Sequence, residues 1–288
     1  MTQALINAPA LRALLASGSP LLLCDCSFDL SDTGAGVRHH AERHVPGAIY
    51  LNLDQDLSAP KRTVDGAPFA GRHPLPTREA FVARLAALGF RDDLMVVAYD
   101  ASGGMYAARL WWMLRWVGHA AVQVLDGGLA AWTAADGALQ SGAAPVLASG
   151  NFTLRPPLVS TLAFEDLLDG LGRGSRLIVD ARSPDRFRGE NETLDPVGGH
   201  IPGAANRFFR DNLGPEGRFK PADQLRGEWQ QLIGGRRPAD LVQQCGSGVT
   251  ACHNLLALEV AGLGGSALYP GSWSEWCGRS EAPVATGA

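Results

Sequence analysis

The sequence predicts an α/β fold that is built twice, each copy a mainly parallel sheet flanked by helices. Short apolar runs alternate along the chain with stretches of helical periodicity, and the same series of motifs occurs in both halves of the 288 residues. Strands that alternate with helices pack as parallel sheets covered on both faces. A chain of this length also corresponds to two domains of ordinary size.

The repeat is visible in the order and spacing of the motifs. "LLLCD", "HVPGA" and "VLDGGLAAW" in the first half correspond to "RLIVD", "HIPGA" and "LYPGSWSEW" in the second. His44 precedes Asp100 by 56 positions, whereas His200 precedes Cys245 by 45, so the first half contains extra chain between these points. We expect one domain at 1–140, a linker at 141–155 that is rich in Ala, Gly and Ser, and a second domain at 156–288.

Three apolar runs of the first half, "LLLCD", "MVVAYD" and "VQVLDG", predict buried strands. Between them, "TREAFVARLAALG" has apolar residues at helical spacing, with Thr77 as the expected N-cap and Gly89 beyond the end. "YAARLWWMLRWVG" is apolar on most sides and predicts a buried helix. In the second half, "RLIVD" and "DLVQQ" are the corresponding strands.

Composition excludes several classes of protein. The net charge of -4 argues against a nucleic-acid binder with a broad basic surface. The first residues lack the features of a signal peptide, and no apolar run reaches about 18 residues, so no membrane association is expected. Five cysteines form an odd and sparse set rather than a disulfide framework, which predicts a reducing, cytoplasmic setting.

The stretch "QQCGSGVTACHN" carries the strongest chemical signal. Cys245 follows an apolar run, at the carboxyl end of a predicted strand, where ligands bind in α/β sheets. Gly246 and Gly248 allow the backbone N–H groups to turn inward as an anion-binding nest, and a helix is expected to begin near Val249 or Thr250. Both features favour the thiolate form of a cysteine, so this pattern predicts a nucleophile.

Three other interpretations of Cys245 remain to be weighed. A packed core thiol is the common state of a free cysteine, but the adjacent glycines argue against it. A metal site with Cys252 and His253 lacks a fourth ligand, and these two residues fall inside the expected helix and point in different directions. A cysteine-dependent phosphatase needs an arginine six positions after the cysteine, where this chain has Ala251. We therefore expect no metal and no cofactor.

The motifs together resemble those of the two-domain rhodanese-like sulfurtransferases, over nearly the whole chain. "HVPGA", "HIPGA" and "GSWSEW" are similar to elements of that family, and "CGSGVTA" resembles the active loop of its mercaptopyruvate branch. In the thiosulfate branch, the two residues after the cysteine are typically basic, whereas here they are Gly246 and Ser247. The resemblance implies two tandem rhodanese-like domains, of which the first is catalytically inactive because Asp100 takes the place of the cysteine.

The resemblance also implies the reaction. Cys245 takes a sulfane sulfur from 3-mercaptopyruvate, becomes a persulfide, and passes the sulfur to a thiol such as thioredoxin or to cyanide. Ser247 is expected to relay a proton, bond the donor's carbonyl or serve as a turn residue. Alternatives are a thiosulfate:cyanide sulfurtransferase and a persulfide carrier without efficient turnover of small donors. The expected ring of N–H donors comprises Gly246, Ser247, Gly248, Val249 and Thr250.

Charged residues around the loop complete the expected site. Arg186 is the substrate-binding arginine by resemblance, and its planar guanidinium suits a carboxylate. A second arginine, nine positions later in the family, is replaced here by Asp195. Asp180 is expected to support the loop or to cap a turn. His44 is expected to bond a loop carbonyl or to assist proton transfer.

Overall fold

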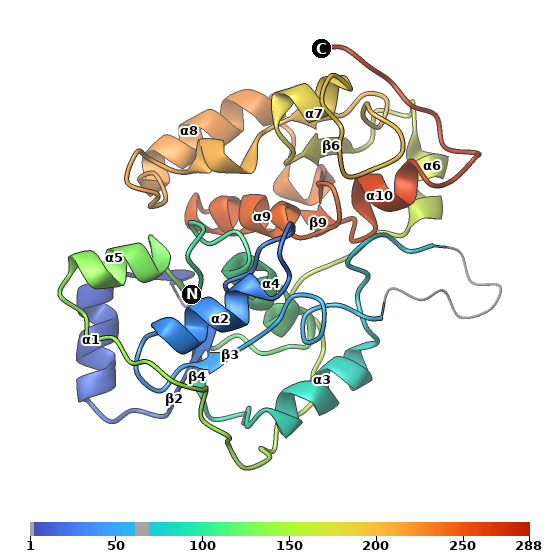
Figure 1. Cartoon of the computed structure of the whole chain (residues 1–288). Helices are drawn as coiled ribbons and strands as arrows, with labels where there is room; N and C mark the ends of the chain where they lie inside the picture. Colours follow the sequence, from blue (N-terminus) through green and yellow to red (C-terminus); the bar gives the residue numbers. More distant parts are fainter. Residues whose placement is uncertain (1–2, 61–68) are drawn as a thin grey trace. The chain divides into compact units, whose positions relative to one another are not determined.

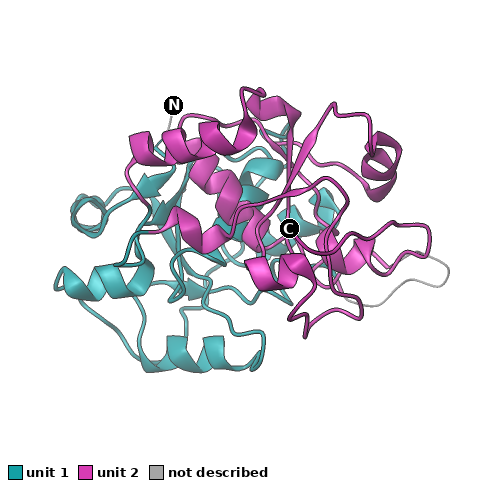
Figure 2. Cartoon of the chain, turned by 90° about the horizontal axis from the view of Figure 1, so that it is seen from above, with its two compact units in different colours: residues 1–59, 76–158, 214–219 teal, residues 60–75, 159–213, 220–288 magenta. Residues whose placement is uncertain are grey.

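The computed structural model describes residues 3–60 and 69–288, which form two compact units (Figures 1 and 2). Unit 1 comprises Met1–Ala59, Pro76–Leu158 and Gly214–Phe219. Unit 2 comprises Pro60–Leu75, Val159–Leu213 and Lys220–Ala288. A short segment of each half of the chain thus belongs to the unit that is formed mainly by the other half.

Unit 1 contains one five-stranded parallel sheet with the strand order β1-β5-β4-β2-β3. Apolar residues of β2 and β4 are buried, as expected for strands covered on both faces. Its elements are β1 (Leu5–Ile6), α1 (Ala8–Ala16), β2 (Leu21–Asp25), α2 (Ala35–Glu42), β3 (Ile49–Tyr50), α3 (Arg78–Ala87), β4 (Met95–Tyr99), α4 (Ala107–Trp116), β5 (Val122–Leu125) and α5 (Gly128–Ala134).

Unit 2 contains a four-stranded parallel sheet with the strand order β7-β6-β8-β9. Trp273 and Trp276 are fully buried in its core, where they pack with Val242 of β8. Its elements are α6 (Phe164–Gly170), β6 (Leu177–Asp180), α7 (Pro184–Arg188), β7 (Ala205–Asn206), η1 (Phe209–Asn212), α8 (Ala222–Ile233), η2 (Pro238–Asp240), β8 (Leu241–Gln244), α9 (Thr250–Val260), β9 (Ala267–Leu268) and α10 (Ser272–Trp276).

Local signals in the sequence set several element boundaries. The Thr77 hydroxyl accepts the N–H of Ala80 at 3.1 Å and so caps α3, and Gly89 beyond its end has a φ of +90°. Helix α9 begins at Thr250, as predicted, and α4 is buried along most of its length. No helix in 3–60 or 69–288 has the length and apolarity needed to span a membrane.

The stretch that the sequence suggests as a linker, 141–155, contacts the body of unit 1. The Arg155 N–H donates to the Val117 carbonyl at 3.0 Å, and the Gly150 N–H donates to the Ala86 carbonyl at 2.8 Å. The Thr153 hydroxyl donates to a carboxylate oxygen of Asp92 at 2.6 Å. These bonds hold the stretch against unit 1.

Candidate active site

Cys245 directly follows the last residue of β8, at the carboxyl edge of the unit 2 sheet. Its N–H donates to the Ser272 hydroxyl at 3.1 Å, and its carbonyl accepts the N–H of Trp273 at 2.9 Å. Only 2% of the residue is exposed. Its backbone is therefore fixed between the sheet and the start of α10, so the thiol has a defined position.

The turn after Cys245 requires glycine. Gly248 has a φ of +76°, and a Cβ built on it would lie 2.4 Å from the carbonyl oxygen of Pro270. Helix α9 begins two residues later, at Thr250. The first N–H groups of a helix lack partners within that helix, so the positive end of α9 is five residues from the thiol.

The corresponding loop of unit 1 shows what such a turn binds. Asp100 directly follows β4, and each of its carboxylate oxygens accepts two backbone N–H groups. Burial raises the pKa of Asp100, and the four N–H donors oppose that shift. Because every one of these partners donates, the ionised carboxylate fits the loop. The four donors are Ser102 at 2.7 Å, Gly104 at 2.9 Å, and Tyr106 and Ala107 at 2.8 Å each.

Ser247 has a partner that the sequence did not reveal. Its hydroxyl lies 2.7 Å from Nδ1 of His73, and both residues are buried. His73 comes from Pro60–Leu75, the segment of the first half that belongs to unit 2. A hydroxyl held by an imidazole can accept or deliver a proton, which is one of the three roles that the sequence suggested for Ser247.

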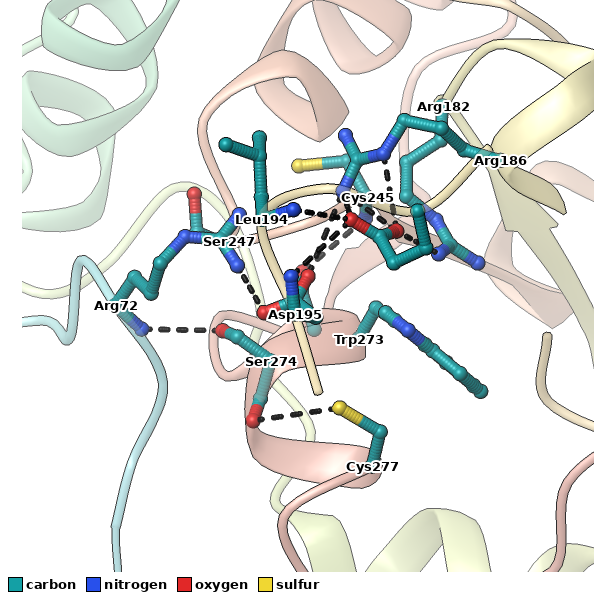
Figure 3. A network of polar contacts seen from close by, with 12 residues as sticks. Arg72, Arg182, Arg186, Leu194, Asp195, Cys245, Ser247, Trp273, Ser274 and Cys277 are labelled. Carbon is teal, nitrogen blue, oxygen red and sulfur yellow. Dashed lines mark hydrogen bonds and ion pairs between the residues drawn. The ribbon is translucent and has the colours of Figure 1, made fainter. Parts of the chain in front are cut away.

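Two arginines converge on Gly246. A Cβ built on this glycine would lie 2.9 Å from Nη2 of Arg72 and 3.4 Å from Nη2 of Arg186. The Arg186 side chain donates to both carboxylate oxygens of Glu192, at 3.0 and 2.9 Å. It also forms a 3.4 Å ion pair with Asp195 (Figure 3). Arg72 also pairs with Asp195 (Figure 3).

Glu192 lies at the buried side of this cluster. Burial would raise the pKa of Glu192, but hydrogen bonds from the Leu194 N–H and from Arg186 outweigh it, so the pKa is lowered. The ionised carboxylate holds Arg186 in one orientation, with its guanidinium edge toward Gly246.

Asp180 supports the site through hydrogen bonds to Arg182 and through its place in the sheet. It is fully buried, and its carboxylate accepts hydrogen bonds from the backbone and the guanidinium of Arg182, the shortest at 2.6 Å. Arg182 in turn lies over the ring of Trp273 and donates to the Gly199 carbonyl. In the sheet, Asp180 pairs with Gln244, the residue before Cys245. Asp180 therefore fixes the strand end from which the loop starts.

His44 lies in unit 1. Its Nδ1 contacts the His40 carbonyl at 2.6 Å, and its ring stacks on that of His40 with centroids 3.9 Å apart. The sequence predicted a bond to a loop carbonyl, whereas the structure places this contact at a carbonyl of helix α2. His200, at the same place in the repeat, similarly contacts the Phe187 carbonyl and stacks on that ring.

The structure thus brings most of the expected site residues together in unit 2 and adds two. Arg72 and His73 were missed because they belong to the first half of the sequence, in a segment that the structure assigns to unit 2. The 11 additional positions between His44 and Asp100 were the available signal, since Arg72 and His73 lie within that interval. The expected residues gathered in unit 2 are Asp180, Arg186, Cys245, Gly246, Ser247, Gly248, Val249 and Thr250.

Comparison with known proteins shows the family to which the chain belongs. The family model described as "Rhodanese-like domain" matches residues 7–135 and 163–279. The chain is 47% identical to the "Probable 3-mercaptopyruvate sulfurtransferase" of Pseudomonas aeruginosa, with 98% of each chain covered. It is 40% identical to human 3-mercaptopyruvate sulfurtransferase, over 95% of this chain and 90% of the relative. The structure of 3-mercaptopyruvate sulfurtransferase from Leishmania major superposes with a TM-score of 0.84 at 29% identity, covering 98% of this chain and 76% of that one.

Proposed function

Because the chain belongs to the family of proteins with rhodanese-like domains, we propose that it is a sulfurtransferase that acts on 3-mercaptopyruvate. In this proposal Cys245 takes the sulfur of the donor, holds it as a persulfide and passes it to an acceptor. Unit 1 is catalytically inactive, since Asp100 occupies the place of the cysteine and a carboxylate cannot carry a sulfane sulfur.

One observation carries the proposal: the loop at this place of the repeat binds an anion. In unit 1 the four N–H groups around Asp100 hold a carboxylate, and in unit 2 Cys245 occupies the corresponding position after β8. A thiolate and a persulfide are both anions that such donors stabilise. The loop therefore supports the reactive cysteine before sulfur transfer and the loaded cysteine after it.

In the first step, the Cys245 thiolate attacks the sulfur of 3-mercaptopyruvate. A new S–S bond forms, the bond between sulfur and carbon breaks, and its electron pair remains on the carbon. The proton of the donor's thiol ends on that carbon, which gives pyruvate and an ionised persulfide. In this proposal the hydroxyl of Ser247, which lies 2.7 Å from Nδ1 of His73, carries this proton.

In the second step, a nucleophilic acceptor attacks the outer sulfur. The S–S bond breaks, Cys245 leaves as the thiolate, and the acceptor carries the sulfur away. We propose a thiol acceptor, such as a reduced thioredoxin, with cyanide as an alternative nucleophile. All five cysteines are free thiols in the structure, which suits a reducing compartment such as the cytoplasm.

Arg186 binds the carboxylate of the donor in this proposal. Its guanidinium is close to Gly246, the residue after the nucleophile, and 19% of its side chain is exposed. A planar guanidinium whose far side is fixed by Glu192 presents its remaining N–H groups in a set direction.

Steady-state kinetics with two donors test the proposal. We expect kcat/KM for 3-mercaptopyruvate to exceed that for thiosulfate, and Cys245→Ser to lower turnover at least about a thousandfold, because the variant lacks the nucleophile. A much higher kcat/KM for thiosulfate would favour a thiosulfate sulfurtransferase. If Cys245 gains sulfur but neither donor turns over, the protein is instead a persulfide carrier.

A further inference from the structure

We propose that unit 2 contains a second ligand site, a cavity beside α6 that binds a small aromatic carboxylate. The cavity has a volume of about 230 Å³ and is lined by α6, the start of β6 and the loop at Pro202 and Gly203. Leu177 is the first residue of β6, so the cavity lies at the amino edge of the parallel sheet, whereas Cys245 lies at the carboxyl edge. The site is therefore separate from the active site, and it goes beyond the proposed function without resting on it.

The repeat shows how the cavity arises. Helices α1 and α6 hold the same place in the two halves, and counted from their N-cap residues, Leu11 corresponds to Leu167 and Leu14 to Gly170. Leu11 and Leu167 are both buried in the core of their unit. Leu14 packs against the core of unit 1, whereas a Cβ built on Gly170 would meet no described atom within 4 Å. A leucine thus fills in unit 1 the space that is open in unit 2.

The strand after each helix shows a second replacement. Strands β2 and β6 end at Asp25 and Asp180, and counted back from these residues, Leu21 corresponds to Arg176. Leu21 packs against the core of unit 1, whereas Arg176 is exposed and lines the cavity. The second half of the chain therefore has open space and a positive charge where the first half has two apolar contacts.

The inner wall of the cavity is apolar. Leu167 and Ile178 line it, are 3% and 7% exposed, and belong to the hydrophobic core of unit 2. The half-buried Leu171 packs against the same core and also lines the cavity. Sites for drug-sized molecules have volumes of about 300–1,000 Å³, so this cavity fits a smaller ligand. A flat aromatic ring system is such a ligand, because it buries much apolar area and loses little conformational freedom.

Two arginines give the cavity a positive charge. Arg176 and Arg236 line it, and neither guanidinium forms a hydrogen bond or an ion pair with another residue of 3–60 or 69–288. The charge of Arg176 also acts on Asp240, but that carboxylate is bound by Arg237 through hydrogen bonds of 2.9 and 2.8 Å. With two arginines and one acid, Asp166, the lining has a net charge of +1. This charge favours an anion, and a guanidinium suits a carboxylate.

Calorimetric titration with indole-3-acetate tests the site, and indole-3-acetamide serves as the neutral ligand of nearly the same shape. We expect the acid to bind the wild type with a Kd of about 0.1–1 mM and the amide to bind at least about fivefold more weakly, because only the acid is attracted by the arginines. Gly170→Leu places in unit 2 the residue that unit 1 has and closes the cavity. It is expected to weaken the binding of both ligands more than about tenfold.

Arg176→Leu separates the charge of the site from its shape. We expect it to weaken the binding of indole-3-acetate about three- to tenfold and to bring the Kd values of the two ligands together. The matched control is Arg173→Met, since Arg173 is an exposed arginine of the same loop that does not line the cavity. Arg186→Met removes a cation of the active site, and both it and Arg173→Met are expected to leave the Kd of indole-3-acetate unchanged.

The outcomes distinguish the cavity from the active site. If indole-3-acetate shows no binding up to about 5 mM, or if a folded Gly170→Leu variant binds it as the wild type does, the inference fails. Weaker binding in Arg186→Met but not in Arg176→Leu would place the carboxylate in the active site and would also overturn it. Should Gly170→Leu not fold, the difference between Arg176→Leu and Arg173→Met decides. None of these measurements involves sulfur transfer, so a failure of the proposed function leaves the result unaffected.

Discussion

The loops that begin at Asp100 and Cys245 have similar backbone surroundings, but the side chain of the first residue differs between them. Each loop follows a buried parallel strand. The carbonyl of its first residue accepts an N–H from the second helix along the chain, from Leu129 of α5 in unit 1 and from Trp273 of α10 in unit 2. In unit 1 the anion is the chain's own carboxylate, bound by four N–H groups. In unit 2 the same position carries a thiol.

Loop length also differs between them. Helix α4 begins seven residues after Asp100, whereas α9 begins five residues after Cys245. The longer loop of unit 1 wraps around a carboxylate, which also accepts the N–H of Ala107, the first residue of α4. The shorter loop of unit 2 leaves fewer residues between Cys245 and the start of α9. In the proposed function, the comparison teaches that one backbone design serves as a structural anchor when aspartate follows the strand and as a site for a reactive anion when cysteine follows it.

Gly248→Ala is expected to have the largest effect among the variants that separate the two loops. A side chain there meets both an unfavourable φ of +76° and the Pro270 carbonyl at 2.4 Å, so the loop must move. Displacement of a nucleophile by about 1 Å lowers rates about 100-fold, and we expect kcat/KM to fall by that factor.

Gly227→Ala is the control for this substitution. Gly227 lies inside α8, and a Cβ there meets no described atom within 4 Å. It is expected to stabilise the protein by about 0.5–1 kcal/mol and to leave kcat/KM unchanged. Equal activity of the Gly248→Ala variant and the wild type would show that the shape of the loop does not position Cys245.

Asp100→Ala tests whether the carboxylate of Asp100 stabilises the fold of unit 1. Four backbone N–H groups, three of them on the buried residues Gly104, Tyr106 and Ala107, lose their acceptor. We therefore expect the free energy of unfolding to fall by about 2–4 kcal/mol in urea titrations. Activity per folded molecule is expected to remain, since Asp100 takes no part in sulfur transfer. A stability change below about 0.5 kcal/mol would mean that the carboxylate does not anchor unit 1.

Gly246→Ala is expected to have the smallest effect. Gly246 is outside the left-handed region, so the backbone tolerates alanine, but the new Cβ would lie 2.9 Å from Nη2 of Arg72. This flexible side chain is expected to move, which raises the KM for 3-mercaptopyruvate about three- to tenfold and leaves kcat nearly unchanged. An unchanged KM would show that the donor does not bind beside Gly246.

Much of the fold could be predicted because it depends on local patterns. The buried strands, the cap of α3 and the start of α9 each follow from a few neighbouring residues. Strand β1, Leu5–Ile6, was not predicted, because two residues carry no periodic pattern and the strand exists through its pairing with β5. Cys245 and Gly248 could also be identified from the sequence, because a glycine-containing turn after a strand is a local pattern.

The charged part of the site was harder to predict. Arg72 and His73 reach the loop only because their segment belongs to unit 2, and no local pattern states where a segment packs. In the sequence, Asp195 stands where the family has a second arginine, which indicated the loss of a cation from the site. In the structure it is the acid that pairs with both Arg72 and Arg186, so a second cation is present in the cluster from another part of the chain.

Peptide mass spectrometry after treatment with 3-mercaptopyruvate, without an acceptor, tests the central claim most directly. The account predicts the added mass of one sulfur atom on the peptide that contains Cys245, its removal by a thiol, and no such adduct in Cys245→Ser. An unmodified Cys245, or a sulfur atom found on Cys24, Cys26, Cys252 or Cys277 in its place, would contradict it.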